Sequence, residues 1–264
     1  MNQQRLEEIR DLDDLIFEEF KKYSMEIFES NFKSDFPNTL RITLNFTTST
    51  NFIKNSIFDG LENDDLFGPK ILFRSLIEHY LKFQLIWLKW AETKTDKYSE
   101  EFLNFSTAKE ILDNLKAEID AHKIHNPLLE IKSWNEIFEK IPQLKEYTKS
   151  EIEDKSKEIS YKNIIRKLKQ IDNNGQETKL FGSLIKEYSE LSSYVHGGIL
   201  SHNQMLKFAD EKIRKDEIER IAGLTFQITA TIKLFSLIMF IQNPEDRKKF
   251  ENSYLIIDSI MKKL

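Results

Sequence analysis

Two stretches of the chain carry side chains that can do chemistry within otherwise apolar helical patterns. The first contains Arg74 and Glu78, four residues apart on a stripe that continues through leucines. The second runs from Tyr188 through Ser192 to His196 and stops at two glycines. An Arg can neutralise a phosphate, a carboxylate can orient an imidazole, and an imidazole can move a proton near neutral pH. The two stretches therefore predict an acid–base site where their helices meet.

The helical wheel limits this prediction. Arg74 and Glu78 fall within about 40° of one line, whereas His79 lies about 140° from Arg74 and is expected to face elsewhere. We keep His79, with Tyr188 and Ser192, among the candidate binding residues. Ser192 lies in the middle of the second apolar face, with the imidazole at its edge. In a second interpretation, a buried Arg–Glu pair bonded to a Ser and a His only fixes helix register. The sequence pattern does not decide between an acid–base site and this structural role.

Composition excludes several other kinds of chemistry. The 264 residues contain no Cys, which excludes disulfides, zinc–thiolate sites, iron–sulfur clusters and thiol nucleophiles. The sequence has no phosphate-binding glycine loop, nucleophile elbow or zinc-protease motif. His122 and His125 lack a carboxylate at ligand spacing, so neither a metal site nor a cofactor is predicted. A net charge of −5 restricts any RNA binding to a local basic patch.

One local basic patch occurs in the second half of the chain. Lys162, Arg166, Lys167 and Lys169 follow Tyr161 within a helical pattern. Such runs are typical of a solvated helical face, and a basic patch is also the feature that RNA contact requires. The patch is a secondary candidate for RNA contact.

The elements that position these residues are predicted to be helices throughout. With 7 Gly, 5 Pro, 40% apolar and 31% charged residues, the composition favours an all-α fold. Helical periodicity covers residues 4–33, 38–61, 69–93, 98–121, 143–172, 178–197, 215–242 and 245–263, with a short helix near Trp134. Residues 41–46 alternate like a strand, but a lone strand would have no partner, so helix is predicted there as well.

Proline, glycine and polar residues predict where the helices end. Pro37 is expected to end the first helix, and Gly68–Pro69 to restart the chain with Pro at a first helical position. Gly197–Gly198 is expected to cap the C-terminus of its helix. A polar connection through Asn203 and Lys212 should lead to the next helix. Further breaks are expected at Pro127, Pro142, residues 172–175 and Pro244.

We expect one bundle domain over residues 1–264, with its core formed by the helices that begin near 69, 178 and 215 and a peripheral insertion at about 95–175. The apolar run Ile221–Ile241 is long enough to raise the question of a membrane span. Because it contains Lys233 and lacks a matching basic flank, we expect a buried core helix and no membrane association. The polar N-terminus does not resemble a signal peptide, which predicts a cytoplasmic protein.

Two short motifs carry a resemblance to a bacterial all-helical family. The motif Arg-Ser-Leu-x-Glu occurs at residues 74–78, and Tyr-x-x-Leu-Ser-x-x-Val-His at residues 188–196. The resemblance covers about residues 45–90 and 180–200. The second motif, with the glycine that follows it, is also similar to the HEPN superfamily. HEPN proteins are helical bundles that often dimerise, and many are metal-independent ribonucleases of toxin–antitoxin and other defence systems.

The HEPN resemblance implies roles for particular residues. In that motif an Arg and a polar residue precede a His in one helix; His196 matches the His and Ser192 the polar position. Leu191 occupies the position of the Arg, so Arg74 is expected to substitute from the neighbouring helix. His196 would be the acid–base group and Arg74 the charge stabiliser, with Glu78 and Ser192 as supports.

The resemblance implies a HEPN-like bacterial effector that acts on RNA, in a defence or toxin context, as a metal-independent endoribonuclease. The implied partners are RNA and a second copy of the chain, and no cofactor is implied. The alternative is a non-catalytic helical module that binds a protein partner or a nucleotide signal through the same residues.

Overall fold

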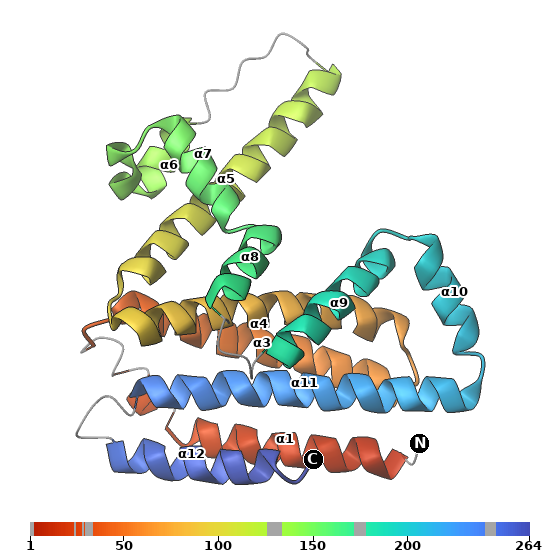
Figure 1. Cartoon of the computed structure of the whole chain (residues 1–264). Helices are drawn as coiled ribbons and strands as arrows, with labels where there is room; N and C mark the ends of the chain where they lie inside the picture. The colour runs from red at the N-terminus through yellow and green to blue at the C-terminus, as the bar shows by residue number, and fades with distance from the viewer. Residues whose placement is uncertain are drawn as a thin grey trace.

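The structure is a computed structural model that describes residues 3–23, 25–27, 29, 34–125, 134–171, 178–240 and 247–264. Within these residues every regular element is a helix (Figure 1), which confirms the all-α prediction. The elements are α1 (Gln3–Lys21), α3 (Pro37–Glu62), α4 (Phe67–Thr93), α5 (Lys97–His125), α6 (Trp134–Lys140), η1 (Pro142–Glu146), α7 (Lys149–Glu158), α8 (Tyr161–Ile171), α9 (Thr178–Val195), α10 (Ile199–Lys207), α11 (Glu211–Phe240) and α12 (Arg247–Met261).

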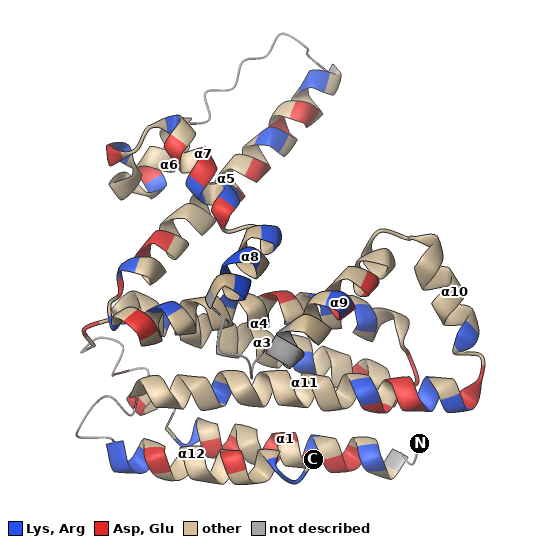
Figure 2. Ribbon diagram, in the orientation of Figure 1, with Lys and Arg blue, Asp and Glu red and all other residues tan. Residues whose placement is uncertain are grey.

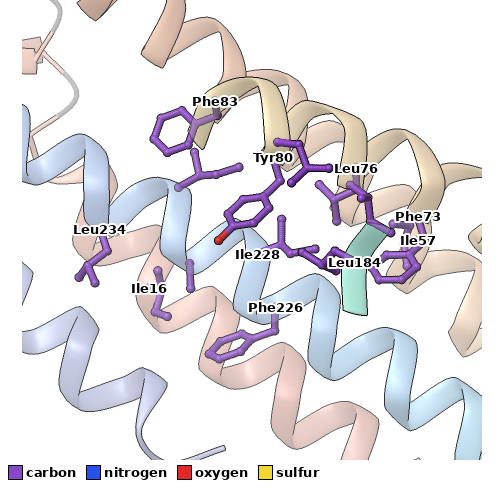
Figure 3. Close-up of a cluster of buried hydrophobic side chains, with 14 of the residues drawn as sticks. Ile16, Ile57, Phe73, Leu76, Tyr80, Phe83, Leu184, Phe226, Ile228 and Leu234 are labelled. Atoms are coloured by element: carbon purple, nitrogen blue, oxygen red, sulfur yellow. The ribbon is translucent and has the colours of Figure 1, made fainter. Parts of the chain in front are cut away.

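Helix α11 runs through the middle of the bundle. α1 and α12 pack along one side of it, and α3 and α4 along the other (Figure 1). Apolar side chains of five helices meet between these layers (Figure 3), among them Ile16, Ile57, Phe73, Leu76, Tyr80, Phe83, Leu184, Phe226, Ile228 and Leu234. α4 is apolar on most sides and is central, as its pattern predicts. α9 packs one face against α4.

Among the described residues, α11 is the one helix long and apolar enough to cross a membrane by length and composition. Most of its apolar stretch is buried against the other helices. Lys233 lies within this stretch and is only 1% exposed. The helix therefore lies in the core of the bundle, as expected.

Several predicted boundaries differ from the structure. The first helix ends at Lys21, and Pro37 begins α3 instead of ending the helix before it. The free backbone N–H groups at this end of α3 bond to Asp96, at 2.9 Å from Asn38 N and 2.7 Å from Thr39 N. A carboxylate from the α4–α5 connection thus caps α3, because the first N–H groups of any α-helix have no partner within the helix. Residues 41–46 are helical, as predicted.

One predicted connection and one predicted helix also differ from the structure. The polar connection through Asn203 is largely a helix, α10, whose first turn is fixed by a hydrogen bond from Ser201 N to Ser193 Oγ at 3.0 Å. The charged segment 143–172 forms three elements, η1, α7 and α8, and a capping box at Thr148 begins α7. α4 begins at Phe67, ahead of its proline. The breaks predicted at Pro127, residues 172–175 and Pro244 lie outside the described residues.

A second apolar cluster lies in the arm that projects from the bundle in Figure 1. Its members come from α5, α6, η1 and α7, and include Phe105, Leu112, Ile137 and Ile152. The apolar side chains of α8, by contrast, join the main core. The peripheral insertion predicted at about 95–175 thus contains one part with its own core and one helix that packs on the bundle.

Candidate functional site

Helix α4 positions four charged residues at intervals of four. Lys70, Arg74, Glu78 and Lys82 follow one another along the helix, each displaced by about 40° from the last. Each makes an ion pair, either with a neighbour in this row or with another helix. Polar side chains of this kind need partners when they lie against apolar helices. Arg74, in the middle of the row, hydrogen-bonds to Tyr188 and Ser192 of α9, and we call this contact between α4 and α9 the seam.

Arg74 lies at the centre of this seam. Its Nε donates to Ser192 Oγ at 3.1 Å, and one terminal nitrogen donates to the Tyr188 hydroxyl at 2.5 Å. The guanidinium also lies 4.3 Å from the centre of the Tyr188 ring, which adds a cation–π contact. The predicted convergence of the two motifs is thus present for these three residues. The Arg74 side chain is 20% exposed, so the seam reaches the surface.

Glu78 supplies the negative charge of the seam. Its carboxylate lies 3.9 Å from the Arg74 guanidinium and 2.9 Å from Lys82 Nζ, and it accepts a long hydrogen bond from the Tyr188 hydroxyl at 3.5 Å. Burial opposes ionisation of Glu78, but Lys82 and Arg74 outweigh it and hold the pKa below its ordinary value. Glu78 is therefore a carboxylate at neutral pH and acts as an acceptor.

A third helix, α8, contributes Tyr161 to the seam. Its ring stacks on Tyr188, with ring centres 3.5 Å apart and planes 20° apart. Its hydroxyl is buried and has no hydrogen-bond partner in the described part of the chain. Burial first, and then nearby Tyr188 and Glu78, raise the pKa of Tyr161. The pKa of Tyr188 is raised as well, chiefly by burial. Both phenols therefore stay protonated near neutral pH and remain hydrogen-bond donors.

His196 lies outside this cluster, which corrects the prediction that it meets Arg74 and Glu78. α9 ends at Val195 and the imidazole is exposed. The imidazole lies one turn beyond Ser192, and His196 N still bonds to Ser192 O at 3.2 Å. Gly197, with φ 63°, then ends the helix, and Gly198 N bonds back to Ser193 O at 2.8 Å, as in a Schellman cap.

The candidate His79, and Leu191 at the HEPN arginine position, also lie away from the cluster. The Nδ1–H of His79 donates to the carbonyl oxygen of Ser75 at 2.8 Å, and its ring meets Phe46 of α3 edge-on at 5.9 Å. His79 therefore faces α3, as the wheel indicates, and does not join Tyr188 and Ser192 as a binding residue. Leu191, at the position of the HEPN arginine, is buried in the core.

The role of Gly197 as the end of α9 can be tested against a glycine inside the same helix. Gly197→Ala is expected to lower the free energy of unfolding by about 1 kcal/mol, because an L-residue is strained at positive φ. Gly182 lies inside α9 with open space around it. Gly182→Ala is expected to raise the free energy of unfolding by up to about 1 kcal/mol. Urea denaturation of both variants measures these changes. If neither variant or both variants had a lower free energy of unfolding than the wild type, this assignment of the cap would be contradicted.

A second polar network, which the sequence did not reveal, adjoins the seam. Lys70 pairs with Glu217 of α11, and Arg220 binds Glu217 at 2.7 Å. Arg220 also binds Glu187 of α9 through two bonds of 3.0 and 2.7 Å. Burial by itself would raise the pKa of Glu217, but the hydrogen bonds from Arg220 and Lys70 outweigh burial and hold this pKa below its ordinary value. In the sequence, this network is indicated only by Lys70, which lies one helical turn before Arg74 in the charged row of α4.

The fold and the seam define a helical-bundle protein with a half-buried polar cluster around Arg74, where α4, α8 and α9 meet. The DUF5677 family, described as a family of unknown function, matches residues 41–213, and the chain belongs to it. The match contains the seam and ends before Glu217 and Arg220. No curated protein and no solved structure matches the chain.

Proposed function

We propose that this protein is a HEPN-like bacterial effector of the cytoplasm that binds RNA beside the α4–α9 seam and cleaves it without a metal ion. The observation that carries the proposal is the basic face of α8. Lys162, Arg166 and Lys169 are exposed, and α8 contains no acidic residue (Figure 2). On the helical wheel they lie within about 60° of one another, next to the face that carries Tyr161.

The position of this face relative to the seam supports binding of a phosphate backbone. Tyr161 fixes the first turn of α8 against Tyr188, the partner of Arg74. Lys162, the first cation of the face, therefore follows directly on a side chain that contacts the partner of Arg74. Lys167, on another side of α8, is paired with Glu158 at 2.9 Å and is not part of the face. RNA backbones bind to such local clusters even when the net charge of the protein is negative.

The cleavage step is assigned to His196. Its imidazole is exposed one turn beyond Ser192, so it is free to approach an RNA strand. In a metal-independent cleavage, the ribose 2′-hydroxyl attacks the adjacent phosphorus and the 5′-oxygen leaves. The products are a 2′,3′-cyclic phosphate and a 5′-hydroxyl. His196 would transfer the proton, and Arg74 would contribute positive charge from the seam.

The proposal includes a homodimer formed through α10. Ile199, Leu200 and Leu206 are 78%, 67% and 75% exposed, and Val195 at the end of α9 is 43% exposed. Clustered apolar side chains at a surface are typical of protein interfaces. His196 lies between Val195 and Ile199 in the sequence, so this contact would place the imidazole at the edge of the dimer interface.

Cleavage of a single-stranded RNA in the presence of EDTA tests the proposal. His196→Ala is expected to lower the rate by about 10²–10⁴-fold, the usual contribution of a general acid or base. His202→Ala, which removes a second exposed imidazole from α10, is the matched control and should leave the rate unchanged. Cleavage that persists in His196→Ala would exclude the assigned role.

A second candidate function is a non-catalytic helical module that binds a protein partner or a nucleotide signal. It is favoured by one observation: the contacts of Arg74 are internal to the protein, and His196 does not reach them. In this case the wild-type protein would not cleave RNA, and Arg74→Ala would only lower the melting temperature. The EDTA assay on the wild-type protein therefore separates the two functions.

A further inference from the structure

A pocket of about 420 Å³ lies between α9, α10 and the first half of α11, beyond the seam from α8. Three apolar side chains contribute to its wall: Leu191, Phe208 and Ile213. Its volume falls within the range of roughly 300–1,000 Å³ that is usual for small-molecule sites. The pocket therefore has the volume of a small-molecule site, with a small apolar part beside a larger set of charged and polar residues.

Four of the charges that line this pocket already neutralise one another. Lys70 is paired with Glu217, and Arg220 is bonded to both Glu217 and Glu187. Three carboxylates and three cations line the hollow in total, so it presents no net charge. A phosphate or another polyanion would meet as many like charges as opposite ones, which argues against an anionic ligand.

Two charges of opposite sign remain available to a ligand. Lys207 has no ion pair among the residues that the structure describes. Glu190 has only Lys186 on its own helix, at 3.8 Å, and Lys186 is 80% exposed. Lys207 and Glu190 line the same hollow but do not pair with each other. The amide oxygen of Gln204 accepts from Tyr194 at 2.8 Å, which leaves its NH₂ group as a further donor.

We propose that this pocket binds a zwitterionic amino acid with an apolar side chain. Its ammonium group would pair with Glu190, and its carboxylate with Lys207 and the NH₂ group of Gln204. The side chain would lie against Ile213, which is 45% exposed, and Phe208. A zwitterion supplies one charge of each sign, matching the two charges that have no strong partner in the protein.

Titration calorimetry with L-leucine and L-phenylalanine tests the proposal. At least one of the two is expected to bind the wild-type protein. For that ligand, the N-acetylated derivative lacks the ammonium group and the amide lacks the carboxylate. Each derivative is expected to bind at least about tenfold more weakly, because one charge-assisted hydrogen bond is lost.

Variants of the two charged residues locate the site. Glu190→Gln and Lys207→Gln are each expected to weaken binding at least about tenfold. Lys186→Gln is the matched control and should not weaken it, since Lys186 lies outside the pocket lining. All three positions are exposed, so the melting temperatures should stay unchanged. Failure of both amino acids to bind at millimolar concentration, or binding that neither Glu190→Gln nor Lys207→Gln weakens, would overturn the proposal.

Discussion

Replacing Asp13 with Asn is expected to lower the free energy of unfolding by about 3–5 kcal/mol, because two buried cations would then lack a counter-charge. Asp13 of α1, Lys54 of α3 and Lys233 of α11 are all nearly inaccessible to solvent. Asp13 forms an ion pair with Lys54, and its charge also stabilises protonated Lys233. This single carboxylate therefore faces two ammonium groups and offsets only one of their two positive charges.

Urea denaturation at pH 7 measures this effect. Asp14 is the neighbouring acid and is exposed, so Asp14→Asn is the matched control. Its free energy of unfolding should stay within about 0.5 kcal/mol of the wild-type value. A change below about 1 kcal/mol in Asp13→Asn would show that the two lysines do not depend on Asp13.

Replacing Lys233 with Met is expected to have the opposite effect and to raise the free energy of unfolding at pH 7 by about 3 kcal/mol. Nζ of Lys233 has no hydrogen-bond partner in the described part of the chain. Burial lowers the pKa of Lys233 from 10.5 to about 8, against the opposing effect of Asp13. The ammonium is thus less stable in the folded protein than in the unfolded chain, and Met fills a similar volume without the charge.

The pH dependence of stability tests independently whether burying the charged Lys233 side chain destabilises the folded protein. Below pH 8 Lys233 is charged in both states, and the full penalty of burying it applies. Between pH 8 and 10.5 the folded protein loses the proton first, so the penalty disappears as the pH rises. The stability advantage of Lys233→Met over the wild type should therefore shrink across this range. An advantage that stays constant from pH 7 to 10.5 would contradict the burial of a charged lysine.

The convergence of α4 and α9 could be predicted because it depends on helical periodicity. Arg74 and Ser192 each lie on an apolar stripe, and two apolar stripes of one bundle tend to face each other. The position of His196 could not be predicted in the same way. His196 N still bonds to Ser192 O at 3.2 Å, so the helical wheel still applies and places the imidazole at the edge of the apolar face. Whether a residue at that edge is covered depends on which helices pack beside it, and in the structure it is exposed.

Contacts between distant segments account for most of what the sequence did not reveal. Tyr161 joins the seam because α8 packs on α4, and no local pattern indicates that contact. Asp96, in the α4–α5 connection, caps the start of α3. Pro37 alone could not indicate this contact, and it was wrongly interpreted as the end of the preceding helix. Lys233 was visible as a charge in an apolar run, but its neighbours Asp13 and Lys54 belong to two other helices. Apolar periodicity thus predicts helices and their faces, whereas these polar pairings depend on tertiary structure.

The salt dependence of RNA binding tests the proposed site most directly. The dissociation constant of a single-stranded RNA should be measured at several salt concentrations for the wild type and for a variant with Lys162, Arg166 and Lys169 changed to Gln. If these residues contact three phosphates, the logarithmic salt slope should fall by about 2 in magnitude. Replacing three lysines of the α12 segment with Gln (Lys248, Lys262 and Lys263) should leave it unchanged. Absence of RNA binding by the wild type, or an equal slope in both proteins, would contradict the proposed RNA site.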